Sequence, residues 1–87
     1  MKDKVLKVRV ITPKQTLFEG QASSVSSVNS QGKFDILAEH ANFITLIENH
    51  EIEVILPNQK AIHFKFNQAI IVNAQNQVSI FAEPLTN

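Results

Sequence analysis

The sequence predicts an all-β fold of short antiparallel strands, arranged as a sandwich or a barrel. Apolar and polar residues alternate with a period of two through most of the chain, which is the pattern of strands that bury one face. Turn-forming residues interrupt the alternation at intervals of about 8–12 residues, as in sandwiches and barrels. No segment shows an apolar stripe of helical spacing between capping residues.

The first two strands are predicted on either side of a proline. In residues 6–10 the apolar side chains occupy the even positions and alternate with Lys7 and Arg9. Pro13 ends this strand because proline cannot donate to a β-ladder. A second short strand is expected over residues 16–19, ending at Gly20.

The middle of the chain carries weaker patterns. We expect a strand over residues 25–28, where two valines lie among serines, and a turn at Ser30-Gln31-Gly32. An extended run resumes at residues 34–36. Residues 41–47 are ambiguous between strand and helix, although their apolar and threonine side chains alternate at Phe43, Thr45 and Ile47.

Two hairpins are predicted in the last third of the chain. In the first, a three-residue loop at Asn58–Lys60 keeps the apolar residues of both strands on one face, whereas a two-residue loop would pair Val54 with His63 and mix the faces. The second hairpin turns around Ala74–Asn76. The predicted cross-strand pairs are Leu56–Ile62, Val54–Phe64, Glu53–Lys65, Val72–Val78 and Ile70–Ile80.

Charge and apolar composition limit the kinds of partner that the chain can have. Eight basic and eight acidic residues give a formal net charge of zero, which argues against a nucleic-acid partner. The first 14 residues hold five basic residues and one acidic residue, which indicates a solvated basic strand or, alternatively, a surface for an acidic partner. The longest apolar runs, such as Ala69–Val72, are far shorter than the ~20 residues that span a bilayer, so membrane contact is expected only through a partner.

The sequence favours no enzymatic chemistry, metal or cofactor. It has no cysteine, and its only glycines are Gly20 and Gly32, so a nucleophile elbow and a phosphate loop are both excluded. His50 has no second histidine at the spacing of a known ligand pair and is expected to be an exposed loop residue. Glu51 and Glu53 are expected on the solvated face of a strand rather than as an acid/base pair.

Three segments in series resemble one protein family. Residues 32–43 read GKFDILAEHANF and resemble the segment G-E-F-G-I-L-P-G-H-A-P-L of the epsilon subunit of F-type ATP synthases, called delta in mitochondria. The VITP and LFEG segments near the start resemble the family's V-T-P-E-G-x-V-F-E-G opening. The segment NQVSIFAE near the end resembles its N-x-V-T-V-L-A-D closing. The resemblance covers about residues 5–83.

The resemblance implies a single domain over residues 1–87, folded as an antiparallel β-sandwich of about ten short strands. It implies a non-catalytic, cofactor-free subunit of the central rotor stalk, which couples the gamma subunit to the ring of c subunits during ATP synthesis. Such a subunit would be a monomer when isolated and would lie at the cytoplasmic face of the bacterial plasma membrane, with an organelle inner membrane or a thylakoid membrane as the less favoured alternative. A free-standing sandwich that binds a peptide or small ligand is the alternative.

The resemblance also implies partner contacts by position. The Gly32–Asp35 segment is expected to be a loop that meets the c ring, and the His40–Phe43 segment is expected near gamma and the ring. Core packing is an equal alternative for the two phenylalanines, and a hydrogen bond within its own loop is the alternative for His40. The expected contact residues are Gly32, Lys33, Phe34, Asp35, His40, Ala41, Asn42 and Phe43.

Several residues depart from the family pattern. Lys33 stands where an acidic residue is expected, which reverses the charge at that contact. Either the ring loop is acidic here or the contact is made differently. Ala38-Glu39 stands for Pro-Gly and Asn42 for Pro, so a less rigid loop is expected there. Gln68-Ala69 stands for Gly-Gly. The C-terminal helical hairpin typical of the family, to which regulation and nucleotide binding are attributed, is not expected in this chain, which ends at Asn87.

Overall fold

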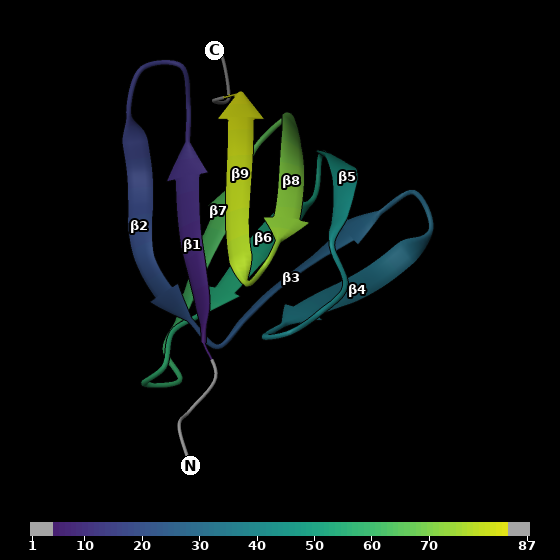
Figure 1. The fold of residues 1–87 in the computed structure, drawn as a ribbon. Coiled ribbons are helices and arrows are strands. Elements are labelled where there is room, and N and C mark those ends of the chain that lie inside the picture. Colours follow the sequence, from purple (N-terminus) through teal and green to yellow (C-terminus); the bar gives the residue numbers. More distant parts are fainter. Residues whose placement is uncertain (1–4, 84–87) are drawn as a thin grey trace.

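The fold is a sandwich of two β-sheets (Figure 1). The computed structural model describes residues 5–83, which contain nine strands where about ten were expected. One sheet has the order β2-β1-β9-β8-β5 and the other the order β4-β3-β6-β7, which confirms the predicted β-sandwich. The strands are β1 (Leu6–Ile11), β2 (Thr16–Ala22), β3 (Ser24–Asn29), β4 (Gly32–Leu37), β5 (Phe43–Glu48), β6 (Glu51–Ile55), β7 (Ala61–Lys65), β8 (Gln68–Ala74) and β9 (Gln77–Glu83).

The first and last strands pair side by side near the middle of the five-stranded sheet. β1 runs parallel to β9, from Lys7 opposite Gln77 to Ile11 opposite Phe81, while every other described pair is antiparallel. Because this ladder joins residues about as far apart in the chain as the fold allows, the five-stranded sheet is complete only when both ends of the chain are in place.

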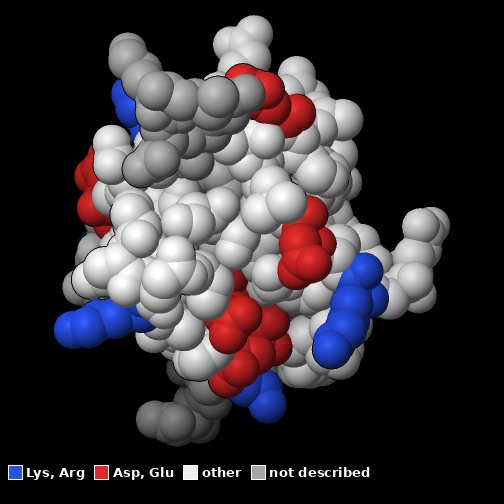
Figure 2. Space-filling view, turned by 90° about the horizontal axis from the view of Figure 1, so that it is seen from below, with Lys and Arg blue, Asp and Glu red and all other residues white. Residues whose placement is uncertain are grey.

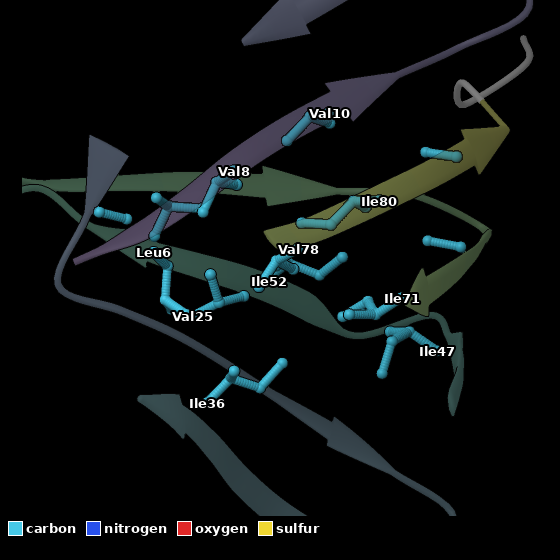
Figure 3. Packing of buried hydrophobic residues seen from close by; sticks show 14 of the residues in the cluster. Leu6, Val8, Val10, Val25, Ile36, Ile47, Ile52, Ile71, Val78 and Ile80 are labelled. Atoms are coloured by element: carbon cyan, nitrogen blue, oxygen red, sulfur yellow. The ribbon is translucent and has the colours of Figure 1, made fainter. Parts of the chain in front are cut away.

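The core is an aliphatic layer between the two sheets (Figure 3). Each strand contributes its inward side chains at every second position, as the period-two pattern predicted. Most of these residues are β-branched, which suits the pleated surface of a sheet. The largest fully buried apolar side chains are Leu6, Ile36, Ile47, Ile52, Ile71, Ile80, Val8, Val10, Val25, Val54 and Val78.

Aromatic pairs close the two open sides of the sandwich. On one side the rings of Phe18 in β2 and Phe64 in β7 have centroids 6.5 Å apart. On the other side, Phe34 in β4 meets Phe43 in β5 edge-on, with centroids 5.9 Å apart and an interplanar angle of 89°. Each pair joins the edge strands of opposite sheets, so the aromatic rings cover the aliphatic core where the sheets end.

The expected end of β2 at Gly20 is wrong, because the strand continues to Ala22. Gly20 lies opposite Val8 in the β1–β2 ladder. A Cβ added at Gly20 would lie 3.3 Å from the ring of Phe18. The glycine therefore leaves room for the inward-facing phenylalanine instead of interrupting the strand.

The predicted register of the first hairpin is wrong by two residues. Val54 lies opposite Ile62, and Glu53 lies opposite His63 rather than Lys65. The loop does have three residues, but they begin at Pro57: the Gln59 amide donates to the Leu56 carbonyl at 2.9 Å, and Gln59 has a φ of 74°. A turn followed by one left-handed residue is a common three-residue hairpin loop. A slip of two keeps the predicted apolar residues facing inward.

The predicted register of the second hairpin is wrong by one residue, which reverses the faces of β8. Ala74 lies opposite Gln77, so only Gln75 and Asn76 form the turn, with φ values of 52° and 64°. Two consecutive positive φ values are typical of the tight two-residue turn that matches strand twist. Ile71 consequently lies opposite Ile80 in the core, whereas Ile70 and Val72 point outward.

The weaker predictions for the middle of the chain are confirmed, except that Gly32, which was placed in the turn, is the first residue of β4. The serine-rich segment forms β3, the turn lies at Ser30-Gln31 ahead of Gly32, and the extended run forms β4. The ambiguous segment 41–47 is largely strand β5. Within residues 5–83 no helix is long and apolar enough to cross a lipid bilayer.

The observed register of β8 makes a direct stability prediction. Replacing Ile71 by alanine should lower the free energy of unfolding by about 2–5 kcal/mol, because it leaves a cavity in the core. The same change at Ile70, which is 45% exposed, should cost less than about 1 kcal/mol. Chemical denaturation of both variants checks this expectation. A larger loss of stability in Ile70→Ala than in Ile71→Ala would instead support the register predicted from the sequence.

The loop between β6 and β7 gives a second prediction. Gln59 has a positive φ, so replacing it by glycine should raise the free energy of unfolding by about 1 kcal/mol. Asn58 is the matched control, because its side chain accepts a hydrogen bond from the Lys60 amide at 3.0 Å and its φ is not positive. Glycine at position 58 should therefore destabilise the protein in the same thermal or denaturant titration.

Candidate partner-binding site

The loop of residues 38–42, which joins β4 to β5, holds three of the eight residues predicted to bind partners, namely His40, Ala41 and Asn42. Its backbone reverses direction in a short turn, in which the His40 amide donates to the Leu37 carbonyl at 3.1 Å. Glu39 has a φ of 65°, a left-handed conformation that favours glycine. This is a position where the resembling family segment has glycine, so the turn is kept although the residue differs.

Three asparagine side chains fasten this loop to the β8–β9 hairpin. The Asn73 Nδ2 group donates to the Ala41 carbonyl at 3.0 Å. The Asn42 Oδ1 atom accepts from the Gln75 amide at 3.0 Å, and the Asn76 Oδ1 atom accepts from the Glu39 amide. The sequence predicted a less rigid loop because two family prolines are absent. The structure places three side-chain hydrogen bonds on the same segment.

Asn73 is the most deeply placed member of this group. Its side chain is 1% exposed and lies opposite Phe43 in the β5–β8 ladder. Its Oδ1 atom has no hydrogen-bond partner within the described residues, which costs stability because a buried polar atom has lost its water. Asn73 therefore binds the loop from inside the sandwich. Sequence reasoning missed it, because the predicted hairpin register did not place Asn73 inside.

The ring of His40 lies on the aromatic pair at the side of the sandwich. Its centroid is 5.4 Å from that of Phe43, which in turn contacts Phe34. Both phenylalanines are half-buried and pack against the core. This agrees with the alternative that Phe34 and Phe43 serve core packing. The His40 Nδ1 atom lies 3.2 Å from the Ala41 carbonyl oxygen, the contact within its own loop that was weighed as an alternative. His40, Ala41 and Asn42 nevertheless remain exposed.

The segment Gly32–Asp35 is not a loop, contrary to expectation. It forms the first part of β4 and pairs with β3 from Gly32 opposite Asn29 onward. Ser30 and Gln31 make the turn instead, and Gly32 has a φ of 118°. Because a strand rises about 3.4 Å per residue, Gly32 lies about 17 Å along β4 from Leu37, where the loop begins. The eight predicted residues therefore form two groups.

Lys33 and Asp35 lie on the outer face of the four-stranded sheet, beside an open hollow of about 440 Å³. Serines of β3 form its floor, and Ser26 Oγ donates to Asp35 Oδ1. Glu51 and Glu53 of β6 stand on the other side. Figure 2 shows Asp and Glu side chains gathered on the end of the molecule that points down in Figure 1, with Lys and Arg side chains around them.

The chemistry of this hollow is that of a charged surface. Glu53 pairs with His63 of β7 at 2.9 Å, and both side chains are a little less than half exposed, so the pair adds less than about 1 kcal/mol to stability. Among residues 5–83 no group of three or more potential metal ligands converges. Exposed carboxylates and lysine on a shallow surface can attract a charged partner, but they do not activate a nucleophile.

Comparison with known sequences decides the family. Residues 5–87 match the family described as the ATP synthase, Delta/Epsilon chain, beta-sandwich domain. This chain belongs to that family. The match spans all the strands of the structure, so the delta/epsilon sandwich accounts for both sheets and for the loop that the three asparagines hold.

Two bacterial ATP synthase epsilon chains are similar to this delta/epsilon chain. It is 30% identical over 78 residues to the ATP synthase epsilon chain of a Nitratiruptor species, a match that covers 90% of this chain and 60% of the relative. It is 32% identical over 79 residues to that of Helicobacter pylori, covering 91% and 63%. The chain thus spans less than two thirds of the length of these relatives.

Solved structures share the delta/epsilon fold. A chain in the Euglena gracilis mitochondrial ATP synthase structure, OSCP/F1/c-ring in rotational state 1, superposes with a TM-score of 0.84 at 12% identity, covering 92% of this chain and 51% of that one. A chain of the Tetrahymena thermophila mitochondrial ATP synthase central stalk/c-ring gives 0.75 at 13% identity, covering 100% and 69%. At these identities the likeness concerns the fold.

The contact between Asn73 and the loop predicts a measurable loss. Replacing Asn73 by alanine should lower the free energy of unfolding by about 1–3 kcal/mol, since the Ala41 carbonyl loses the hydrogen bond from the buried Asn73 side chain. It should also speed hydrogen exchange at the amides of residues 39–42. Asn67, which is exposed, is the matched control, and its alanine variant should change neither quantity appreciably. Unchanged exchange in the Asn73 variant would contradict the role assigned to its side chain.

Proposed function

We propose that this chain is a non-catalytic subunit of the central rotor stalk of a proton-translocating F-type ATP synthase, where it couples the gamma subunit to the c ring. The observation that carries this proposal is the family match over residues 5–87. The relatives are named ATP synthase epsilon chain, and the titles of the similar structures describe F1/c-ring and central stalk/c-ring assemblies. Both support the same role.

The physical properties of the sandwich suit this role. A part that transmits torque must resist deformation, and here two sheets enclose an aliphatic core that aromatic pairs close on both sides. It must also offer outer surfaces for two partners rather than a reactive cleft. We infer one domain over residues 1–87, with no chemistry of its own.

The predicted contact residues fit two contacts better than one. The exposed loop residues His40, Ala41 and Asn42, next to Phe43, form the contact proposed near gamma and the ring. The segment Gly32–Asp35, which includes the half-buried Phe34, is the contact proposed for the c ring. Because Lys33 is exposed on β4, an acidic group on the ring would complement it.

The proposed location follows from the proposed partners. The chain would be a peripheral part of a membrane-associated F1 complex and would meet the membrane only through the c ring. The bacterial relatives support the cytoplasmic face of the plasma membrane. In isolation the chain would be a monomer.

Affinity capture from native membranes tests the proposed function, with this chain as bait. Recovery of gamma and the catalytic subunits is the expected result. Recovery of a different partner, without any ATP synthase subunit, would contradict the proposal and favour a free-standing binding module.

Lys33 gives a sharper prediction for the ring contact. Replacing Lys33 by glutamate should weaken attachment to the c ring, because repulsion replaces attraction at the acidic group. Added salt should then weaken binding of the parent chain but not of the variant. Lys60, an exposed residue next to the β6–β7 loop, is the matched control for charge reversal. Attachment measured across a salt series should change for Lys33→Glu and not for Lys60→Glu. Equal behaviour of the two variants would remove Lys33 from the contact.

A further inference from the structure

One large polar side chain lies inside the aliphatic core. Among the largest fully buried side chains of residues 5–83, Asn73 alone is polar. Its neighbours across the two ladders of β8 are Phe43 of β5 and Val78 of β9, both apolar. The other inward positions of β8 are also apolar, namely Ala69 and Ile71. The core pattern therefore favours an apolar residue here, and the asparagine needs a separate explanation.

The Asn73 side chain lowers global stability where it lies. Its Nδ2 group donates to the Ala41 carbonyl at 3.0 Å, but its Oδ1 atom has no partner within the described residues. A buried acceptor without a donor loses the hydrogen bonds that water would supply. Turning the amide over would not help, because Oδ1 would then face the Ala41 carbonyl oxygen, which is also an acceptor. An apolar residue of similar size would avoid this loss.

The hydrogen bond from Asn73 is the best protected of the three asparagine contacts to the loop of residues 38–42. The contacts that Asn42 and Asn76 make with backbone amides are both exposed, whereas the contact of Asn73 is part-buried. Water competes for the donors and acceptors of exposed hydrogen bonds, so those bonds add less to the order of a loop. Asn73 therefore holds the loop more firmly than the other two asparagines do.

The residues of this loop do little to restrict its backbone. The loop contains no proline and no glycine, and Glu39 holds a φ of 65°, which is strained for a residue with a side chain. Its short turn is closed by the hydrogen bond from the His40 amide to the Leu37 carbonyl. A segment with few internal contacts can open while the rest of a domain stays folded. The order of this loop therefore depends on contacts from outside it.

We propose that Asn73 is a positioning residue, which keeps the loop of residues 38–42 closed on the β8–β9 hairpin and lowers global stability in doing so. The loop then has a closed and an open state, and Asn73 favours the closed one. The inference deepens the proposed function and rests on it in one respect, because the closed loop presents His40, Ala41 and Asn42 to gamma. A partner that binds only the closed state has an apparent affinity that falls with the closed fraction.

The variant Asn73→Val separates the order of the loop from global stability. Valine is apolar, similar in size and favours strands, so the thermal midpoint of unfolding should equal or exceed that of the parent chain. The amides of Glu39 and His40 donate hydrogen bonds in the closed loop. Their hydrogen exchange, followed by NMR, should nevertheless become about three to ten times faster, as the loss of one hydrogen bond implies.

Binding of purified gamma subunit, measured by calorimetry, tests the consequence for the partner. The affinity of Asn73→Val should fall at least about threefold, because fewer chains hold the loop closed. Asn67→Val makes the same change at an exposed turn position and is the matched control. It should leave amide exchange and affinity within about twofold of the parent chain.

A rescue variant shows whether the order of the loop is the cause. Ala38 has no positive φ, and its amide donates to no residue of the range 5–83, so proline fits at this position. Proline stands there in the resembling family segment. Adding Ala38→Pro to Asn73→Val reduces the freedom of the open loop and should return exchange and affinity to within about twofold of the parent chain.

Several results would overturn this role of Asn73. If Asn73→Val melts clearly below the parent chain or does not fold, the asparagine supports the core and lowers nothing. If exchange is unchanged, or stays fast after the proline is added, Asn73 does not act through the order of the loop. If exchange rises while gamma affinity stays the same, Asn73 does not position the loop for gamma. If the parent chain does not bind gamma, the proposed function fails, but the thermal midpoints and exchange rates still decide whether Asn73 orders the loop.

Discussion

The two-residue turn at Gln75 and Asn76 fixes the register on which the core, the loop and the outer face of the five-stranded sheet depend. With both residues at positive φ, Ile71 and Asn73 enter the sandwich and Ile70 leaves it. The turn also holds its neighbours directly. The Asn76 carbonyl accepts from the Lys7 amide at 2.9 Å, and its side chain accepts from the Glu39 amide. A change of one residue in this turn would therefore alter three parts of the molecule together.

The same hairpin connects the loop assigned to partners with the five-stranded sheet. The loop of residues 38–42 is fastened to it by Asn73 and Asn42, and its outward residues Ile70 and Phe81 are exposed on the outer face of the five-stranded sheet. A force applied at the loop therefore reaches the sheet through hydrogen bonds to backbone atoms rather than through a flexible linker. The proposed rotor role would need such a connection, and here asparagine side chains hold a segment in which the resembling family has two prolines.

The sequence predicted the elements well and their pairing less well, for physical reasons that differ between strands. β1 alternates with Lys7 and Arg9, so only one face can be buried and its orientation is certain. In β6 and β7 a slip of two residues leaves the faces unchanged. The inward-facing residues were therefore predicted correctly, although Glu53 was paired with the wrong residue. The loop residues were found through the resemblance, but Asn73 was not, because it lies 32 positions from the carbonyl that it binds.

The errors in β8 arise from a feature that bears on function. Ala69-Ile70-Ile71-Val72 is apolar at consecutive positions, so the pattern contains no information about which face is inward. Such runs are typical of strands that are covered on both faces. The outer face of β3, by contrast, presents Ser24 and Ser26, as expected for a strand that meets water. In the isolated sandwich β8 is covered on one face only. The run that made its register unpredictable therefore leaves the apolar side chains of Ile70 and Val72 on the outer face of the sheet.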